Sequence, residues 1–219
     1  IKAALTLLKK PFPTPIHYSF ILLQEGKMST RKGTLVLAED FMKEALKKAK
    51  AEIKKRHGKV NEDTAKAIAY GAVKFAIIRV SPEKNVTFQW DQALAFEGDS
   101  GPYLQYAYAR ISSILSKHKE KINEDINWQS LADHEDFELV KTLGQFPHFV
   151  TQATQQHKPH LIATYMLELA KKFNEFYHSS PILKEQESIR DARLYLISCT
   201  KDILAKGLNL LGIKAIEKM

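Results

Sequence analysis

The residues best suited to chemistry lie in a polar loop near the start of the chain. Lys27-Met-Ser-Thr-Arg-Lys-Gly33 follows a short apolar run and carries three basic side chains, with Ser29 among them. Lysine and arginine cations beside a glycine-flanked backbone are suited to holding polyphosphate, because they supply charge and hydrogen-bond donors. At a leaving pyrophosphate, such cations stabilise the transition state more than the ground state. A solvated hairpin with incidental charges is the alternative interpretation.

A second candidate site is an aromatic face on a predicted helix. Tyr103, Tyr106 and Arg110 are spaced i, i+3 and i+7, so they share one side of that helix. Tyrosine rings stack on unpaired bases, and arginine can stack or bind phosphate. The face therefore predicts contact with unstacked nucleotides. The alternative is that both tyrosines are core residues whose hydroxyl groups bond locally.

The amino-acid composition is typical of a folded protein with a basic surface. The 219 residues include 33 Lys and Arg against 25 Asp and Glu, a net charge of +8, and 44% are hydrophobic. That hydrophobic share is enough for a buried core and argues against disorder. A basic surface attracts phosphate backbones, acidic membranes or acidic proteins, although it can also be only a solvated lysine-rich surface.

The cysteine count and the hydropathy of the sequence indicate the cellular compartment of the protein. Cys199 is the single cysteine, which excludes a disulfide within the chain and a cysteine-based metal site. One free cysteine fits a reducing compartment and predicts a cytoplasmic protein. The sequence shows no signal peptide and no uncharged apolar run near the roughly 20 residues that a membrane span needs. We therefore expect no membrane partner.

Hydrophobic periodicity and turn residues predict a small α/β segment followed by an all-α bundle. Residues 18–23 and 34–37 are predicted strands, and 86–90 is a predicted extended segment. Asp40 and Asp63 are expected to cap helices, while Gly58 and Gly212 are expected to end them. We expect helices at about 40–57, 63–80, 91–98, 102–119, 131–143, 146–157, 160–178 and 189–211.

The polar loop resembles the KMSKS signature of class I aminoacyl-tRNA synthetases, and more closely the form found in arginyl-tRNA synthetases. The resemblance implies that Lys27 and Ser29 are catalytic contacts to the phosphates of ATP, with Mg²⁺ as counter-ion, and that Met28 seats the adenine. Thr30 stands where the general signature has a second lysine. Arg31 or Lys32 would then supply the missing charge.

Two further strings resemble the same family. Glu97-Gly-Asp-Ser-Gly-Pro-Tyr-Leu-Gln-Tyr-Ala-Tyr-Ala-Arg110 is similar to the start of its anticodon-binding domain, although the family often has His in place of Tyr108. Asp191-Ala-Arg-Leu-Tyr195 resembles the DALR pattern that names this domain. The resemblance implies that Tyr103, Tyr106 and Arg110 surround the anticodon loop, and that the terminal Met219 reaches the same site.

This resemblance runs from about Tyr18 to Met219 and implies a mainly α fold in three parts. Residues 1–37 would be the end of a catalytic domain, 38–90 connecting helices that contact the tRNA stem, and 91–219 the anticodon-binding domain. The implied function is that of an arginine–tRNA ligase, with tRNA-Arg, ATP and arginine as partners of a monomer. Alternatives are a non-catalytic tRNA-binding module or a class I synthetase for another amino acid, such as cysteine.

The sequence contains no His-x-Gly-His string, the other ATP-binding signature of class I synthetases. Its opening reads like the middle of a domain, so we expect a longer protein in which this chain is the C-terminal part. We therefore predict that the 219-residue chain alone neither retains ATP nor forms arginyl adenylate. Arginine-dependent exchange of pyrophosphate into ATP measures this, and turnover by the chain would contradict it.

Other reactive residues have structural interpretations. His157 and His160 lack nearby acidic or cysteine ligands and are expected at the surface or at helix caps. Glu135, Asp136 and Glu138 are expected to form a solvated helix start that favours the helix dipole. Cys199 is expected to pack on the core face of the last helix.

Overall fold

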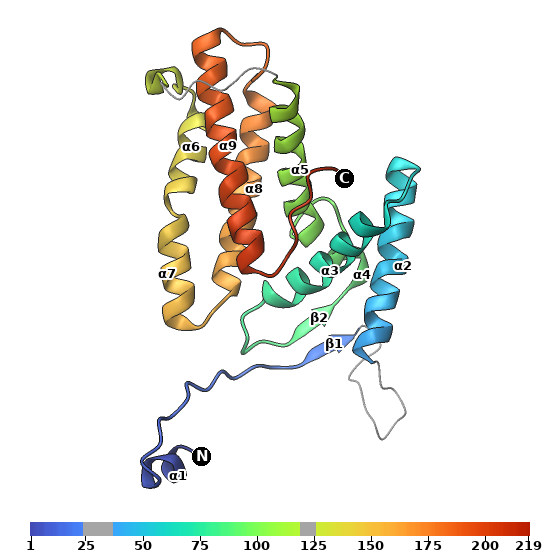
Figure 1. The fold of residues 1–219 in the computed structure, drawn as a ribbon, viewed down its shortest axis with the longest axis vertical. Helices are drawn as coiled ribbons and strands as arrows, with labels where there is room; N and C mark the ends of the chain where they lie inside the picture. The colour runs from blue at the N-terminus through green and yellow to red at the C-terminus, as the bar shows by residue number, and fades with distance from the viewer. Residues whose placement is uncertain (24–36, 119–125) are drawn as a thin grey trace.

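The computed structural model describes residues 1–23, 37–118 and 126–219, and the fold is mainly α, as predicted. Figure 1 shows the arrangement of its elements. In chain order they are α1 (Lys2–Leu7), β1 (Ile21–Leu23), α2 (Ala38–His57), α3 (Glu62–Ile78), β2 (Val86–Phe88), α4 (Trp90–Ala93), α5 (Gly101–Lys117), a 3-10 turn (Trp128–Ser130), α6 (His134–Gly144), α7 (Phe146–Gln156), α8 (His160–Ser179) and α9 (Glu187–Leu210).

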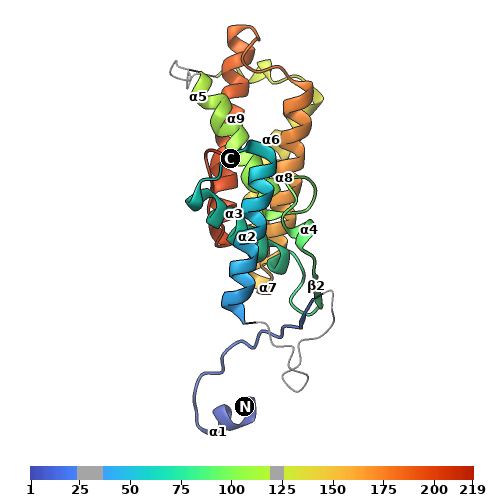
Figure 2. The ribbon, with the colours of Figure 1, turned by 90° about the vertical axis from the view of Figure 1, so that its right-hand side faces the viewer.

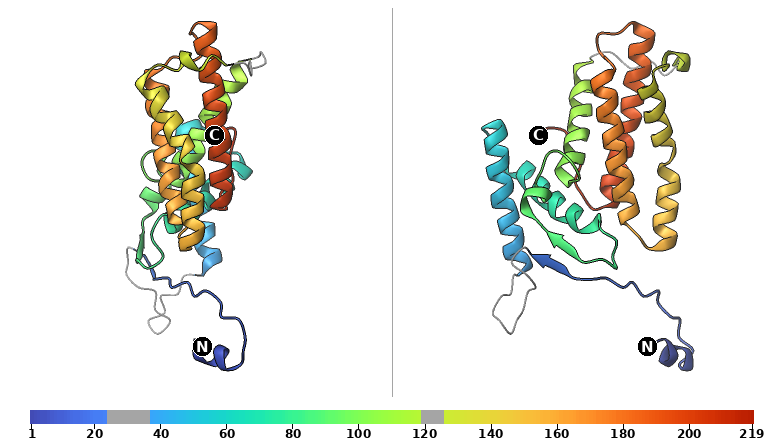
Figure 3. Two further views of the ribbon diagram at one scale, coloured as in Figure 1. Left: turned by 90° about the vertical axis from the view of Figure 1, so that its left-hand side faces the viewer. Right: turned by 180° about the vertical axis from the view of Figure 1, so that it is seen from behind.

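Two layers make up the body of the molecule. Helices α5 to α9 form an upright bundle, and α2 to α4 lie beside its lower half (Figures 1 and 2). Beneath α3, β1 pairs in parallel with β2, with Ile21 opposite Val86. An extended segment leads from β1 to α1, which lies apart from the bundle (Figure 3). The parallel pairing brings residues 21–23 against the segment that follows α3.

Two buried clusters account for the two layers. The bundle cluster is centred on large side chains from α5, α6, α8 and α9, among them Leu104, Ile111, Leu139, Phe173, Phe176, Leu194 and Ile197. The second cluster lies between α2 and α3, where Ala45, Ala49 and Ile53 recur every fourth residue along one face. Phe75 of α3 belongs to the bundle cluster, so α3 joins the two layers.

The first turn of α5 is held tightly against α3. Ser100 caps α5 by accepting a hydrogen bond from the Tyr103 N–H (3.1 Å), and Pro102 occupies the first turn, as predicted. A Cβ on Gly101 would lie 2.6 Å from the carbonyl oxygen of Gly71 in α3. Only glycine fits this crossing without movement of a backbone. The close contact fixes where α5 presents its exposed face.

Two predicted helix caps are wrong. Helix α2 begins after Leu37, and Asp40 lies in its first turn, 3.3 Å from Lys43. Helix α3 is capped by Asn61, whose side chain accepts a hydrogen bond from the backbone N–H of Thr64 (3.0 Å). Any short polar side chain near the start of a helix can cap it. Which of several neighbouring residues does so depends on the backbone conformation of the segment that precedes the helix.

Two other elements differ in extent from expectation. The strand predicted at 18–23 is limited to Ile21–Leu23, because only these residues pair with β2. The short helix predicted at 91–98 begins at Trp90 and ends at Ala93. The centroid of the Trp90 ring lies 4.8 Å from each of the Phe41 and Phe88 ring centroids, so Trp90, partly buried, packs against the cluster between α2 and α3. The second predicted strand, at 34–37, falls almost entirely outside the described residues.

Candidate nucleic-acid interface

The ATP-side residues predicted from the sequence lie between positions 24 and 36. Lys27, Met28, Ser29, Arg31 and Lys32 lie outside the described residues. The structure of the candidate site therefore concerns the aromatic face of α5 and its surroundings.

Tyr103, Tyr106 and Arg110 are half-buried along one side of α5, and a residue of α8 connects them. The Arg110 guanidinium donates hydrogen bonds to Asn174 Oδ1 (2.7 Å) and to the Tyr106 hydroxyl (3.2 Å). The Asn174 amide in turn donates to the Tyr103 hydroxyl (2.8 Å). We call Tyr103, Tyr106, Arg110 and Asn174 the aromatic ridge. Its members are neither sealed in the core nor turned away from one another.

Stacking also holds the Arg110 side chain. Its guanidinium carbon lies 4.6 Å from the centroid of the Tyr106 ring and 4.8 Å from that of Tyr177, which is 38% exposed. Cation–π contacts on two sides and hydrogen bonds at the edge leave the guanidinium little freedom. The ridge is thus a preorganised surface of rings and one cation.

The ridge separates two grooves. The groove on the α2 side measures about 540 Å³ and includes Arg56, Phe96, Glu97 and His178 beside the ridge. The groove on the tail side measures about 880 Å³ and lies between α5, α9 and the C-terminal tail. Tyr106 and Arg110 line both grooves. Each volume exceeds that of a nucleobase, so unstacked bases could lie on either side of the ridge.

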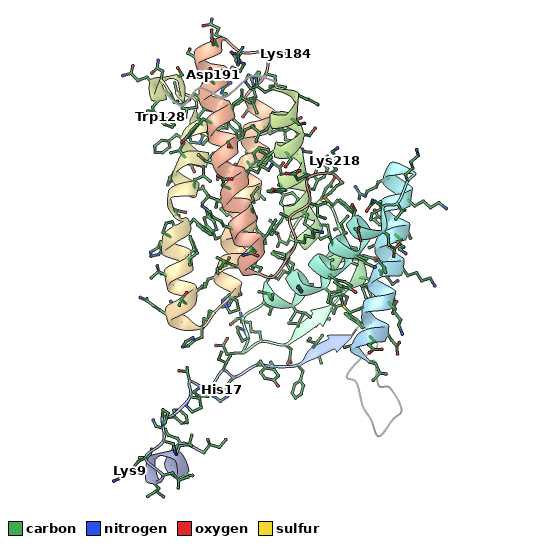
Figure 4. All side chains as sticks on the ribbon, in the orientation of Figure 1. Lys9, His17, Trp128, Lys184, Asp191 and Lys218 are labelled. Atoms are coloured by element: carbon green, nitrogen blue, oxygen red, sulfur yellow. The ribbon has the colours of Figure 1, made fainter. Side chains whose placement is uncertain are left out.

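Cations predominate in the tail-side groove. Lys117, Lys201 and Lys218 line it with Arg110, and Glu217 is the acidic residue of the lining. Figure 4 shows Lys218 on the tail beside α5. This charge excess favours a phosphate backbone.

Met219, which was predicted to reach the same site as the tyrosines, lines this groove. The Lys201 ammonium lies 3.2 Å from the Glu217 carboxylate and 5.2 Å from the centroid of the Tyr108 ring. The structure thus brings Met219 together with Tyr106 and Arg110, although these residues are far apart in the sequence.

Sequence reasoning missed several residues of this surface. One side of α8 carries Asn174, Tyr177 and His178. Their i, i+3 and i+4 spacing in the sequence predicts that they share this side of the helix. On the opposite wall, the Arg56 guanidinium carbon lies 4.7 Å from the centroid of the Phe96 ring. Arg56 lies in α2 and Phe96 in the loop between α4 and α5, so no local pattern pairs them.

Arg193, from the Asp-Ala-Arg-Leu string that resembles the DALR pattern, has a structural role in this chain. Arg193 is only 4% exposed; it pairs with Asp133, lies 3.4 Å from Asp136 and donates a hydrogen bond to the Pro181 carbonyl (2.8 Å). These contacts tie α9 to the start of α6. Asp191, labelled in Figure 4, pairs with the neighbouring Arg190.

The prediction of a solvated acidic cluster is wrong for Asp136, which is fully buried. Its carboxylate accepts a hydrogen bond from the Asp133 N–H (3.2 Å), and packing of α6 on α9 places it against Arg193. Burial raises the pKa of the Asp136 carboxyl above its ordinary value, and Arg193 opposes that shift. The pair is an internal element of the bundle.

The other reactive residues add no second site. His157 ends α7 in a left-handed conformation (φ 55°), the cap role that was expected. Cys199 is half-buried, and burial raises the pKa of its thiol. Over residues 1–23, 37–118 and 126–219, no group of three His, Cys, Asp or Glu could hold a metal ion. Within the same ranges, no helix has the length and apolar character to cross a membrane.

Comparison with known proteins shows the family to which the chain belongs. Residues 104–219, more than half of the chain, match the family model described as the DALR anticodon binding domain. The chain therefore belongs to the DALR anticodon-binding domain family.

The similarity extends over the whole chain. The arginine–tRNA ligases of Methanocella arvoryzae and Methanocaldococcus jannaschii are 42% and 41% identical, over 100% of this chain and 39% of each relative. The arginyl-tRNA synthetase structure from Thermus thermophilus superposes with a TM-score of 0.85 at 35% identity, covering 92% of this chain and 35% of that one. The chain thus spans about two fifths of the length of these curated relatives, and it matches their C-terminal part.

Proposed function

We propose that the chain binds the anticodon arm of tRNA-Arg, and that the whole protein is an arginine–tRNA ligase. The observation that carries the first part is the aromatic ridge, held between two grooves with Met219 in the same surface. The second part rests on the relatives named arginine–tRNA ligase, which extend well beyond the length of this chain.

The ridge suits single-stranded RNA because it combines rings, hydrogen-bonding groups and a cation. Unpaired bases can stack on Tyr106 or Tyr103, at about 1–3 kcal/mol for each base. The amide of Asn174 and the guanidinium of Arg110 offer donors and acceptors for base edges. Since these side chains already hold one another, binding immobilises few additional rotamers, which favours affinity.

For the whole protein, we propose the reaction of an ATP-dependent ligase. Lys27 and Ser29 would bind the ATP phosphates with Mg²⁺, Met28 would seat the adenine, and Arg31 or Lys32 would add charge at the pyrophosphate. Arginine would be activated and then passed to the 3′ end of tRNA-Arg. A monomeric, cytoplasmic protein divided at 1–37, 38–90 and 91–219 completes the proposal.

Binding to two RNAs tests the anticodon proposal. We expect the chain to bind a tRNA-Arg transcript at least tenfold more tightly than the same transcript with its anticodon loop replaced by a stable tetraloop. Stacking of one or two bases is sufficient for that difference. Both titrations require the same salt, because backbone contacts are strongly salt-dependent. Equal affinity for the two transcripts would contradict anticodon-loop binding and leave only non-specific attraction.

A further inference from the structure

The C-terminal tail has little regular structure to hold it where it lies. Helix α9 ends in a glycine turn, where the Gly212 N–H donates to the Asn209 carbonyl (2.9 Å) and the Ile213 N–H to the Leu208 carbonyl (2.8 Å). This turn is the predicted stop. We call residues 212–219 the C-terminal strap; they run from the foot of α9 upward beside α5 and toward α2 (Figures 1 and 2).

One buried amide holds the strap at its middle. Gln105 of α5 is completely buried, and its Nε2 donates to the Lys214 carbonyl (2.8 Å) in the strap. The same nitrogen donates to the Ala67 carbonyl (3.1 Å) in α3. A single side chain therefore connects α5, α3 and the strap.

The space around this amide is provided by a glycine in α3. A Cβ on Gly71 would lie 3.0 Å from Gln105 Nε2, 3.1 Å from its Oε1 and 3.1 Å from Ile213 Cγ2. Helix α3 thus passes close to both the amide and the strap. A larger residue at position 71 would push on the contact that fixes the strap.

One atom of the Gln105 amide carries a cost in folding free energy. Gln105 Oε1 is buried without a hydrogen-bond partner, which costs about 1–3 kcal/mol for such a group. A leucine of similar size would avoid that cost. What the geometry shows for this amide is a link between α5, α3 and the strap through its two donated hydrogen bonds.

The path of the strap determines where the last residue lies. On either side of Lys214, Ile213 packs in the bundle cluster and Ile216 in the α2–α3 cluster. Met219 then packs at the edge of the α2–α3 cluster and lines the tail-side groove with Arg110. A shift of the strap would move Met219 away from the groove.

We infer that Gln105 is a positioning residue for RNA binding, which acts by fixing the C-terminal strap so that Met219 forms part of the tail-side groove. The inference rests on the proposed function but concerns a residue that faces the interior. Gln105 itself does not contact RNA. Its effect is transmitted through the Lys214 carbonyl to the terminal residues.

The test measures the effect of Gln105→Leu in two backgrounds. One is the full chain, and the other is a shortened chain that ends at Ile216. Leucine removes both donated hydrogen bonds at nearly constant volume, and Lys214 is an exposed residue outside the helices, so the fold should persist. We expect Gln105→Leu to weaken binding of the tRNA-Arg transcript roughly tenfold, the size of one lost stacking contact. In the shortened chain the same substitution should change affinity less than about twofold, since coupled changes are not additive.

A spectroscopic readout separates positioning from general destabilisation. The ε-methyl group of Met219, labelled with ¹³C, should lose its distinct resonance in Gln105→Leu and shift toward the position of an unstructured methionine. The methyl resonance of the buried Met166 should stay unchanged. Gln129→Leu, at an exposed glutamine, is the matched control and should alter neither resonance nor affinity.

The outcomes distinguish this inference from the proposed function. If the wild-type chain binds no RNA but the Met219 resonance shifts as expected, the proposed function fails while the role of Gln105 in fixing the strap is supported. If RNA binds and Gln105→Leu leaves both affinity and resonance unchanged, the inference is overturned. Equal losses in the full and shortened chains would also overturn it, because Gln105 would then act by another route.

Discussion

Replacing Arg110 with alanine is expected to weaken binding of the tRNA-Arg transcript by roughly thirtyfold, or about 2 kcal/mol, the size of an arginine hot spot. Among the described residues, Arg110 is the basic side chain that lines both grooves, beside Tyr106. Its loss also leaves the Tyr106 hydroxyl and Asn174 Oδ1 without their donor, so the ridge loses order as well as charge. Filter binding or calorimetry at fixed salt measures the change.

Two companion variants show which property of Arg110 matters. Arg110→Lys keeps the charge but lacks the planar fork that bonds Asn174 and Tyr106 together, so we expect roughly a tenfold loss. Lys141→Ala removes one positive charge from α6, outside both grooves, and should change affinity less than about twofold. Wild-type affinity in Arg110→Lys would show that only charge is needed, contrary to the ridge geometry.

The largest expected effect on stability comes from Arg193→Met. Removing the cation leaves Asp136, which is fully buried, without its compensating charge. Breaking a buried pair in this way costs about 3–5 kcal/mol. The junction between α6 and α9 would also lose the hydrogen bond to the Pro181 carbonyl. Urea unfolding followed by circular dichroism measures the free energy of unfolding.

The pH dependence of that loss identifies its cause. Arg193 lowers the pKa of Asp136 against the opposing effect of burial, so its removal should raise that pKa further. The folded variant would then hold a proton more tightly than its unfolded chain does. The contribution of Asp136 to stability is therefore greatest below the ordinary pKa of aspartate and falls as pH rises through its folded-state pKa. We expect the deficit relative to wild type to shrink in acid.

An exposed ion pair provides the matched control for this experiment. Arg79 and Asp99 lie 3.2 Å apart, with side chains 31% and 70% exposed. Arg79→Met should cost less than about 1 kcal/mol, as is usual for a surface pair. If Arg193→Met were no more destabilising than Arg79→Met, or if its deficit were unchanged by pH, the buried pair would not be what ties α9 to α6.

Local interactions explain what the sequence predicted well. The long amphipathic segments appear as α5 to α9 within a few residues of the predicted bounds, because hydrophobic periodicity depends only on residues three or four apart. Pro102 in the first turn of α5 and the glycine turn at Gly212 follow from backbone preferences of single residues. The shared side of Tyr103, Tyr106 and Arg110 follows from helix geometry alone.

Tertiary structure decided which of these helices meet and what their polar residues do. The sequence places Asn174, Gln105 and Asp136 on helices, but only packing joins Asn174 to Arg110, Gln105 to the strap and Asp136 to Arg193. Such contacts depend on long-range burial, which outweighs the local preference of a carboxylate or an amide for water once partners are supplied. The types of side chain that form the surface are thus local information, whereas their assembly into one site is a property of the folded chain.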